Sequence, residues 1–402
     1  MDEIDVPPFF LCPISLELMK DPVTVSTGIT YDRENIEKWL FSGKNNTCPI
    51  TKQPLSAECD LTPNHTLRRL IQSWCTANAS HGIERIPTPK PPISKIQIAK
   101  LFNNAKSTES KIKCLQNLHS LAFESAANKR CMEATGAVVD FLASIVSAVE
   151  EEEEASNDDG IDKALSILSC LQLSDAALKK LTGRNGEFIK SLTRAMQRGS
   201  YETRAHAVLL LKSMMEVAEP MEMISLETEF FVELVHVLHD QGSNVVLKLL
   251  IQLCPWGRNR VKAVKAGAVT VLIELLLDCF DRRACEMTLV ALYMLCGCAE
   301  GRVELLGHAA GLAIVSKKIL RVSQVASEKA VSILFAISKF SATPAVVQEM
   351  LQLGVVAKLC MMLQVECGSK AKEKAKEILI LHASAWKSSS CIPKSFLSSY
   401  PS

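Results

Sequence analysis

Two short segments place a cysteine beside a proline and a small hydroxyl residue, a combination that could bind a metal or carry a covalent intermediate. They read Cys12-Pro13-Ile14-Ser15 and Cys48-Pro49-Ile50-Thr51, so the hydroxyl follows three positions after each cysteine. A thiolate is a good zinc ligand, and it is a nucleophile when its pKa is lowered or a base stands beside it. Neither cysteine has a histidine nearby in the sequence, which argues against covalent catalysis.

The spacing of these segments resembles a RING finger, aligned on Trp39, whose zinc ligands have mostly been replaced. A structural zinc site needs four good ligands, and only Cys12 and Cys48 remain suitable. We therefore predict no metal and no cofactor, with the loops held by hydrogen bonds and by charges such as Arg33 and Arg68. The positions aligned with RING ligands are Cys12, Ser15, Thr27, Ile29, Asp32, Asn35, Cys48 and Thr51.

A small hairpin and two helices should position these loops. Residues 23–25 and 29–31 are strand formers that flank the turn residues Thr27 and Gly28. The helix that follows should be capped by Asp32 and ended by Gly43. The expected inward residues are Ile36 and Leu40 on this helix and Leu67, Leu70, Ile71 and Trp74 on a helix that opens after Pro63-Asn64.

Beyond residue 94 the sequence is helical and repeats at about 40 residues. In the clearest copies, residues 128–130 lead to Gly136 and residues 259–261 lead to Gly267. Each unit should hold a short, a middle and a long third helix stacked into a solenoid. Weaker copies begin at Gly311 and Gly354, and the poorest matches surround Gly186 and Met221.

Two segments interrupt the helical pattern. A proline-rich stretch, residues 79–94, separates the first block from the repeats and should be extended. The acidic run 150–154 interrupts one repeat with like charges that repel one another. A solvated inter-helix loop is the favoured interpretation of this run, over a dedicated site for a basic partner.

The first block carries a nearly continuous motif. It consists of residues 10–19 (FLCPISLELM), 21–23 (DPV), 27–28 (TG), 30–33 (TYDR), 48–49 (CP) and 63–64 (PN). This motif looks like a U-box, and with armadillo repeats behind it the chain is similar to the plant U-box/armadillo ubiquitin ligases. The implied fold is mainly α, with a small α+β, zinc-free, RING-like U-box followed by an armadillo-type α-solenoid. The implied divisions are a U-box at 6–78, a linker at 79–94, an armadillo domain at 95–390 and a flexible tail at 391–402.

The resemblance implies an E3 ubiquitin ligase that uses no nucleophile of its own and forms no covalent intermediate. The U-box would dock a ubiquitin-charged conjugating enzyme (E2) and promote direct transfer to a lysine of a substrate held by the armadillo repeats. The implied E2-binding residues are Cys12, Pro13, Ile14, Leu16, Trp39 and Pro49. Lys52 would help hold ubiquitin against its carrier, and a dimer through the U-box is also allowed.

Trp39 has a plainer interpretation as a core residue. It lies beside the Ile36 and Leu40 stripe rather than within it, and an aromatic side chain at the edge of a small domain is a natural interface anchor. The motif favours the docking role.

Composition excludes several classes of function. The net charge of +1, from 45 basic and 44 acidic residues, gives no overall field for nucleic acid or an anionic membrane. The acidic start, with Asp2, Glu3 and Asp5, is unlike a secretory signal, and no apolar run approaches a membrane span. We expect a cytoplasmic protein, with the nucleus also allowed, whose 15 cysteines are mostly reduced core residues. Cys296 and Cys298 are too closely spaced for a zinc knuckle.

A non-enzymatic armadillo scaffold or adaptor is the alternative function. Armadillo proteins that bind extended basic peptides line their third helices with asparagine, whose amides grip the peptide backbone. The corresponding positions here are Ser120, Cys170, Ser213, Gln252, Met294, Ala336 and Leu381. None is asparagine, so the sequence argues against that role.

Overall fold

The computed structural model describes residues 5–42, 45–55, 61–88, 93–103, 108–147, 158–183, 186–278, 281–366 and 368–387. Tertiary contacts divide the chain into two compact units, residues 1–93 with 125–128 and residues 94–124 with 129–402. Some predicted features lie outside the described residues: Gly43 as a helix end, Pro89, Pro91 and Pro92 of the linker, the acidic run 150–154 and the tail 391–402.

The predicted hairpin of the first unit is confirmed. Strands β1 (Pro22–Thr24) and β2 (Thr30–Asp32) pair antiparallel, with Val23 opposite Tyr31, and Gly28 takes a φ of 82° in the turn between them. This left-handed backbone favours glycine, because a Cβ would clash with the neighbouring backbone and glycine has none. A third strand, β3 (Thr62–Pro63), pairs with β1 and was not predicted.

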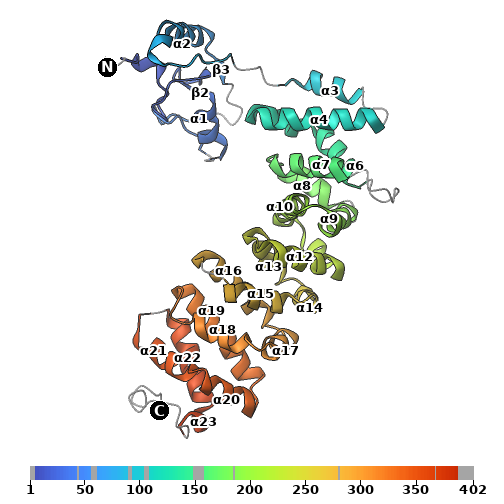
Figure 1. Cartoon of the computed structure of the whole chain (residues 1–402), viewed down its shortest axis with the longest axis vertical. Coiled ribbons are helices and arrows are strands. Elements are labelled where there is room, and N and C mark those ends of the chain that lie inside the picture. The colour runs from blue at the N-terminus through green and yellow to red at the C-terminus, as the bar shows by residue number, and fades with distance from the viewer. Residues whose placement is uncertain are drawn as a thin grey trace. The chain divides into compact units, whose positions relative to one another are not determined.

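Two helices flank this sheet. Helix α1 (Arg33–Glu37) runs into a π-helical turn, Lys38–Ser42, and α2 (His65–Ala77) follows β3 (Figure 1). Ile36 and Ile71 are buried as predicted, but the prediction for Leu70 is wrong, because this side chain is 52% exposed. Leu70 lies one residue before the buried Ile71 and points off the narrow apolar stripe.

The second unit consists of α3 (Lys95–Asn103), the long α4 (Thr108–Glu124) and then a series of three-helix repeats. The first helices of these units are α5 (Ala126–Ala134), α8 (Asp175–Thr182), α11 (Pro220–Ile224), α14 (Asn259–Lys265), α17 (Ala299–Gly307) and α20 (Pro344–Gln352). The second are α6 (Gly136–Ser147), α9 (Glu187–Arg198), α12 (Thr228–Gln241), α15 (Ala268–Asp278), α18 (Gly311–Lys318) and α21 (Val355–Gln364). The third are α7 (Asp158–Cys170), α10 (Tyr201–Val217), α13 (Asn244–Leu253), α16 (Arg282–Leu295), α19 (Gln324–Phe340) and α22 (Ser369–Leu381), and α23 (Ala383–Lys387) ends the series.

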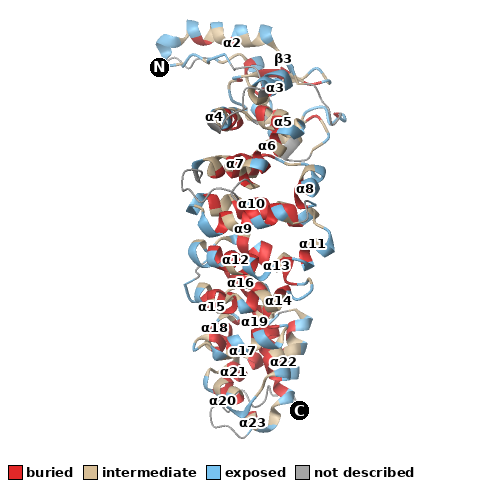
Figure 2. Ribbon diagram, turned by 90° about the vertical axis from the view of Figure 1, so that its right-hand side faces the viewer, coloured by how far each residue is buried: buried red, intermediate tan, exposed pale blue. Residues whose placement is uncertain are grey.

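Helix α4 acts as the first of the third helices, and these helices pack against one another in sequence order from α4 to α22. Residues coloured as buried run along the whole stack (Figure 2). The stretches around Gly186 and Met221, which match the repeat poorly in sequence, form regular three-helix units. Gly186 precedes α9 with a φ of 76°, as Gly354 precedes α21 with a φ of 67°. Burial of the correct helix faces, rather than a sequence signature, maintains the repeat.

A search for membrane spans within the described residues finds no single helix of sufficient length and hydrophobicity. The bent pair α20 and α21 passes the same test by length and composition only.

Candidate functional site

The two cysteine loops of the first unit have the same backbone hydrogen bonds. We call residues 12–17 the first loop and residues 48–53 the second loop. In each, the cysteine N–H donates to the carbonyl of the fifth residue after it, Glu17 or Gln53, both at 2.8 Å. The N–H of that fifth residue also lies 3.4 Å from the loop hydroxyl of Ser15 or Thr51. The loops are therefore two copies of one geometry.

Each loop also contains a residue in the left-handed region. Leu16 has a φ of 58° and Lys52 a φ of 59°, each four positions after its cysteine. A left-handed conformation costs a residue with a Cβ roughly 1–2 kcal/mol, and such strain clusters at functional sites. Leu16 is 74% exposed, so no packing of its own side chain explains the strain.

A first polar cluster gathers around the buried sulfur of Cys12. Its Sγ accepts from the backbone N–H of Asp32 at 3.3 Å and from Asn35 Nδ2 at 3.6 Å. The Asn35 amide also donates to Ser15 Oγ at 3.0 Å. These residues align with RING ligands in the sequence, and here hydrogen bonds connect them, as predicted.

The predicted capping role of Asp32 is wrong. The residue occupies the N-cap position of α1, but its side chain makes no cap hydrogen bond. Its Oδ1 instead accepts from the backbone N–H groups of Lys20 and Asp21, both at 2.8 Å. The carboxylate therefore connects the hairpin to the segment that follows the first loop, where two amide donors converge on one oxygen.

A second polar cluster gathers around the buried sulfur of Cys48. Its Sγ accepts from Thr27 Oγ1 at 3.3 Å and is 3.0 Å from the Tyr31 hydroxyl. That hydroxyl in turn accepts from the backbone N–H of Ile50 at 3.4 Å. Ile29 is one of the positions aligned with RING ligands, but its side chain has no polar atom, and Tyr31 makes the contact with the sulfur instead.

The surroundings of Cys48 favour its thiolate. Burial raises the pKa of this thiol, but hydrogen bonds from Thr27, Thr51 and Tyr31 outweigh burial and lower the pKa to about 6. Burial, followed by the hydrogen bond with Cys48, raises the pKa of the Tyr31 phenol well above its ordinary value. The phenol therefore stays protonated and donates to the sulfur.

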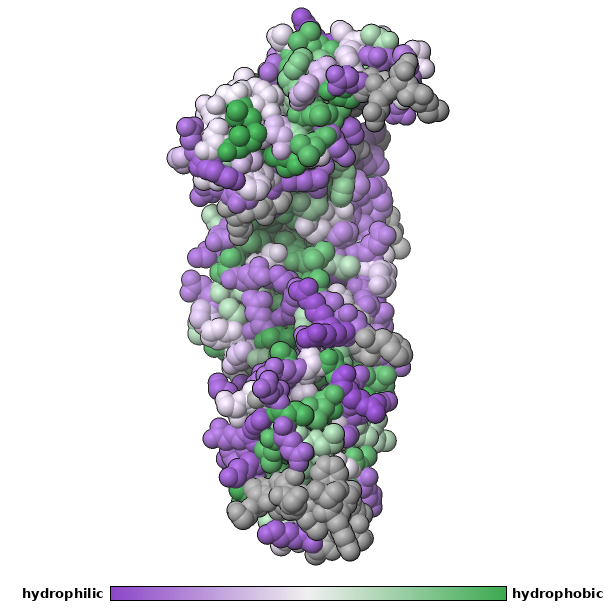
Figure 3. Space-filling view, turned by 90° about the vertical axis from the view of Figure 1, so that its left-hand side faces the viewer, coloured by the Kyte–Doolittle hydropathy of each residue, from purple (hydrophilic) through white to green (hydrophobic). Residues whose placement is uncertain are grey.

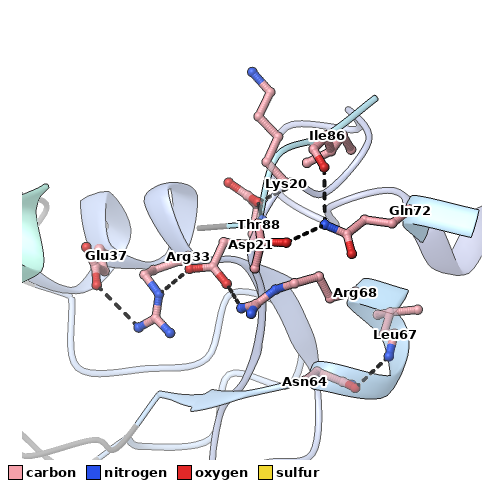
Figure 4. Close-up of polar contacts among 11 residues, drawn as sticks. Lys20, Asp21, Arg33, Glu37, Asn64, Leu67, Arg68, Gln72, Ile86 and Thr88 are labelled. Carbon is pink, nitrogen blue, oxygen red and sulfur yellow. Dashed lines mark hydrogen bonds and ion pairs between the residues drawn. The ribbon is translucent and has the colours of Figure 1, made fainter. Parts of the chain in front are cut away.

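An ion-pair cluster fixes the two helices to the hairpin (Figure 4). The carboxylate of Asp21 binds Arg33 Nε at 2.7 Å through one oxygen and Arg68 through the other. Arg33 also lies 3.8 Å from Glu37. The side chains of Asp21, Arg33 and Arg68 are at most 20% exposed, so water screens these charges little. The predicted help from both arginines is thereby confirmed.

Trp39 is held at the edge of the core beside the second loop. Its Nε1–H donates to the carbonyl of Thr47 at 2.8 Å, and its own carbonyl accepts from Asn45 Nδ2 at 3.1 Å. The ring packs against the core of the unit while remaining half-buried. Lys52 Nζ lies 5.8 Å from the ring centroid. The ring is therefore both fixed in orientation and partly available to a partner.

Most of the predicted docking residues lie at the surface of the two loops. Leu16 and Pro13 are exposed, and Ile14 and Pro49 are half-buried. Cys12 is a correction: it has 0% exposure, so it orients the first loop and cannot itself contact a partner.

Sequence reasoning missed Ile50 as a surface residue. Its side chain is 53% exposed in the second loop, at the position that matches Ile14 in the first. The equal spacing of the two loops was the signal that could have found it.

Metal binding is not supported by the residues that the structure describes, since no cluster of three or more His, Cys, Asp or Glu side chains could hold an ion. Both loop cysteines are fully buried. The site therefore offers an apolar surface with an adjacent lysine, and it exposes neither of the two loop thiols.

The second unit places all the positions compared with an asparagine ladder on its third helices. Each of these side chains is half-buried or exposed: Ser120, Cys170, Ser213, Gln252, Met294, Ala336 and Leu381. The third helices therefore form a surface whose side chains vary from unit to unit.

Family comparisons agree with both halves of the chain. Residues 6–80 match the family described as the U-box domain, and residues 97–402 match the family described as the plant U-box protein ARM repeat region. The chain is 56% identical to E3 ubiquitin-protein ligase PUB23 of Arabidopsis thaliana, an alignment that covers 100% of this chain and 98% of that protein. It is 54% identical to E3 ubiquitin-protein ligase PUB22 of the same plant, over 99% of each.

Among solved structures, the chain resembles the crystal structure of an engineered protein with a TM-score of 0.50. The sequences are 17% identical, and the match covers 75% of this chain and 70% of the other. At that identity the likeness concerns the fold alone.

Proposed function

This chain belongs to the plant family in which a U-box precedes an ARM repeat region, and from that membership we propose how its residues divide the work of ubiquitin transfer. The chain is an E3 ubiquitin-protein ligase, which binds a ubiquitin-charged E2 and a protein substrate. The lysine amine of the substrate attacks the thioester, an isopeptide bond forms, and the E2 thiol leaves. The ligase contributes positioning, which lowers the entropic part of the barrier.

Direct transfer needs no thiol from the ligase. Cys48 is a candidate nucleophile, because its thiol has a pKa of about 6. Its exposure of 0% and its hydrogen bonds from Thr27 and Tyr31 argue against this role, since no thioester could reach the sulfur. The thiolate instead acts as a hydrogen-bond acceptor that holds the second loop.

The E2 docks on the apolar surface of Ile14, Leu16, Trp39, Pro49 and Ile50. One observation supports this proposal: exposed and half-buried apolar side chains lie on two loops whose backbones are held by the polar clusters. A surface that is already ordered loses little conformational entropy when a partner binds. The strained backbone of Leu16 fits the same role, because it holds a large apolar side chain out toward solvent.

Lys52 lies beside this surface and acts on ubiquitin. Its ammonium is 5.8 Å from the Trp39 ring centroid, so a charged donor stands next to the anchor of the E2. A lysine offers rotatable donors at the end of a flexible chain, which suits a contact that must form only when ubiquitin folds back on its carrier. The left-handed backbone fixes where that chain starts.

Substrates bind the second unit, chiefly along its third helices. These helices stack from α4 to α22 and present side chains that vary without disturbing the core. The U-box has little surface to spare once an E2 is docked.

Two substitutions test the docking surface. Trp39→Ala and Ile14→Ala should each reduce E2 affinity about thirtyfold, since a buried interface anchor contributes about 2 kcal/mol. Ubiquitin transfer at limiting E2 should fall accordingly, while circular dichroism stays unchanged. Leu70→Ala is the matched control, because it removes an exposed apolar side chain from α2 and should leave the rate as it was. If Trp39→Ala unfolds the U-box instead, Trp39 is a core residue.

We also propose that two chains pair through their U-boxes and that the protein resides in the cytoplasm and nucleus. Pairing of two U-boxes predicts twice the single-chain mass by light scattering of the full chain, and a single-chain mass contradicts it. Residence in the cytoplasm and nucleus predicts that a fluorescent fusion fills these two compartments and stays off membranes. The charge balance and the absence of a long apolar run in the sequence support this location.

A further inference from the structure

The third helices differ in charge along the second unit. The last three, α16, α19 and α22, carry eight basic and four acidic residues, whereas α4, α7 and α10 carry five basic and seven acidic residues. Figure 3 shows the side of the repeats where α13 and α16 lie, with hydrophobic and hydrophilic side chains intermixed. The chain as a whole has a net charge of only +1, so the basic excess at this end is local.

Lysines from two of these helices converge on one aromatic ring of a third. Lys329 Nζ of α19 and Lys374 Nζ of α22 lie 5.3 and 5.6 Å from the ring centroid of Tyr293 on α16. Lys374 also donates to Ser332 Oγ at 2.8 Å. The ring attracts each ammonium but carries no net charge of its own. Lys329 Nζ also lies 3.7 Å from the Glu328 carboxylate, which compensates part of the positive charge. An added carboxylate could accept from both ammonium groups.

A second cation–aromatic group lies at the C-terminal end of α19. Lys339 Nζ is 5.5 Å from the Phe335 centroid and 5.6 Å from that of Phe340, and Arg302 Cζ is 5.2 Å from Phe340. Phe340 is 64% exposed, which is unusual for so large an apolar side chain. The surface thus combines cations with apolar area, and α19 carries both groups.

We infer that this basic–aromatic surface, centred on Tyr293, Lys329 and Lys374, binds substrate proteins through a segment rich in Asp and Glu. The inference rests on the proposed function, because it names the chemistry of the substrate that the repeats hold. Carboxylates complement the paired ammonium groups, and apolar side chains between them would cover Phe340. Such a segment would lie across α16, α19 and α22 rather than within one repeat.

Single-stranded nucleic acid fits the same surface less well. Base stacking needs open aromatic faces, and ammonium groups already lie over Tyr293, Phe335 and Phe340. Acidic residues are also interspersed on these helices. A nucleic acid carries a charge on every phosphate, whereas a peptide can place uncharged residues opposite these carboxylates. They are Glu286, Glu328, Glu373 and Glu377.

The test is a binding titration of the full chain with a fluorescein-labelled peptide of Asp, Glu, Leu and Gly, in parallel with a single-stranded RNA of equal length. Lys329→Glu/Lys374→Glu should weaken peptide binding at least about tenfold, because two attractive contacts become repulsive. The matched control is Lys265→Glu/Lys317→Glu, which makes the same change in net charge on exposed positions of α14 and α18. Its affinity should stay within about twofold of the native chain.

Three results would overturn the inference: no peptide binding by the native chain, an equal loss in the control, or tighter binding of RNA that the double variant abolishes. Circular dichroism must match among the variants, and Lys329→Gln/Lys374→Gln repeats the test without introducing repulsion. Synthesis of free ubiquitin chains with a charged E2 should be unchanged in the Glu variant. If the peptide binds as expected but a carrier protein fused to it is not modified, the surface is correct and the proposed substrate role of the repeats is wrong.

Discussion

Both units bury cysteines, but the buried thiols are hydrogen-bond acceptors in the U-box and apolar core residues in the repeats. In the U-box, Cys48 is surrounded by donors that lower its pKa to about 6, and Cys12 likewise accepts two hydrogen bonds. In the repeats, burial raises the pKa of Cys254 and Cys296 to about 12. The first pair consists of hydrogen-bond acceptors, and the second pair behaves as small apolar side chains.

The two kinds of cysteine environment reflect the backbone structure that each unit has to stabilise. The U-box has a small core and must fix two irregular loops, whose backbones carry few regular hydrogen bonds, so polar clusters organise it. Each repeat adds another layer of helices whose backbone bonds are internal, so apolar contact suffices. Mutations should therefore disturb the U-box mainly through lost polar contacts and the repeats mainly through lost volume.

The largest effect is expected from Asp21→Asn. It leaves Arg33 and Arg68, which are 20% and 11% exposed, without their shared carboxylate, at a cost of about 3 kcal/mol. Amide hydrogen exchange should rise in the U-box and not in the repeats. Asp140→Asn is the counterpart in the repeats, where the pair with Lys180 is 38% and 60% exposed, and it should change little. Equal effects at the two sites would contradict the comparison.

The next effect separates the two kinds of cysteine directly. Cys48→Ala leaves the buried hydroxyl of Tyr31 and the half-buried hydroxyl of Thr27 without their acceptor and should cost about 2–3 kcal/mol. Cys296→Ala removes only buried volume and should cost about 1 kcal/mol. Region-resolved hydrogen exchange gives both values from the intact chain. A larger loss for Cys296→Ala would show that the repeats, not the U-box, depend on their thiol.

The pH dependence of stability should also differ between the units. The folded pKa of Cys48, about 6, lies below its ordinary 9.0, so between these values the unfolded chain holds a proton that the folded U-box does not. U-box stability from this group therefore rises with pH in that window, by at most about 1.4 kcal/mol per pH unit, and is lost as pH falls toward 6.

The repeats should show the opposite response. The raised pKa values of Cys254 and Cys296 contribute stability that is complete below pH 9.0 and is lost as pH rises toward 12. Urea unfolding followed by limited proteolysis measures the two units separately. In Cys48→Ala the rise in the U-box should disappear, and its persistence would assign the rise to another group.

The smallest effect concerns two leucines with the same backbone. Leu16 in the U-box and Leu320 in the repeats both have a φ of 58°. Glycine at either position relieves left-handed strain but adds freedom to the unfolded chain, so stability should change by only about 0.5 kcal/mol. Leu16→Gly should nevertheless reduce ubiquitin transfer severalfold, and Leu320→Gly should not. Equal rates in the two variants would show that the Leu16 side chain has no part in docking.

The sequence by itself determined the family, the two kinds of unit and the polar side chains that hold the two loops. Motif residues such as Cys12, Cys48 and Gly28 are informative because few structural roles fit their chemistry. A buried cysteine sulfur needs hydrogen-bond donors or a metal, and a turn with a left-handed backbone favours glycine. The helical period likewise reveals the repeats, since burial recurs with each turn.

Other features were decided only by the tertiary structure. The alignment with RING ligands follows backbone positions, so it selected Ile29, while the hydrogen bond to Cys48 depends on the side chain that reaches the sulfur, which is Tyr31. Asp32 stands at a helix start, yet two amides from a distant segment take its carboxylate. Lys329 and Lys374 meet at Tyr293 only because three repeats stack. In each case the contact joins residues far apart in sequence, and local pattern carries no information about which side chains folding brings together.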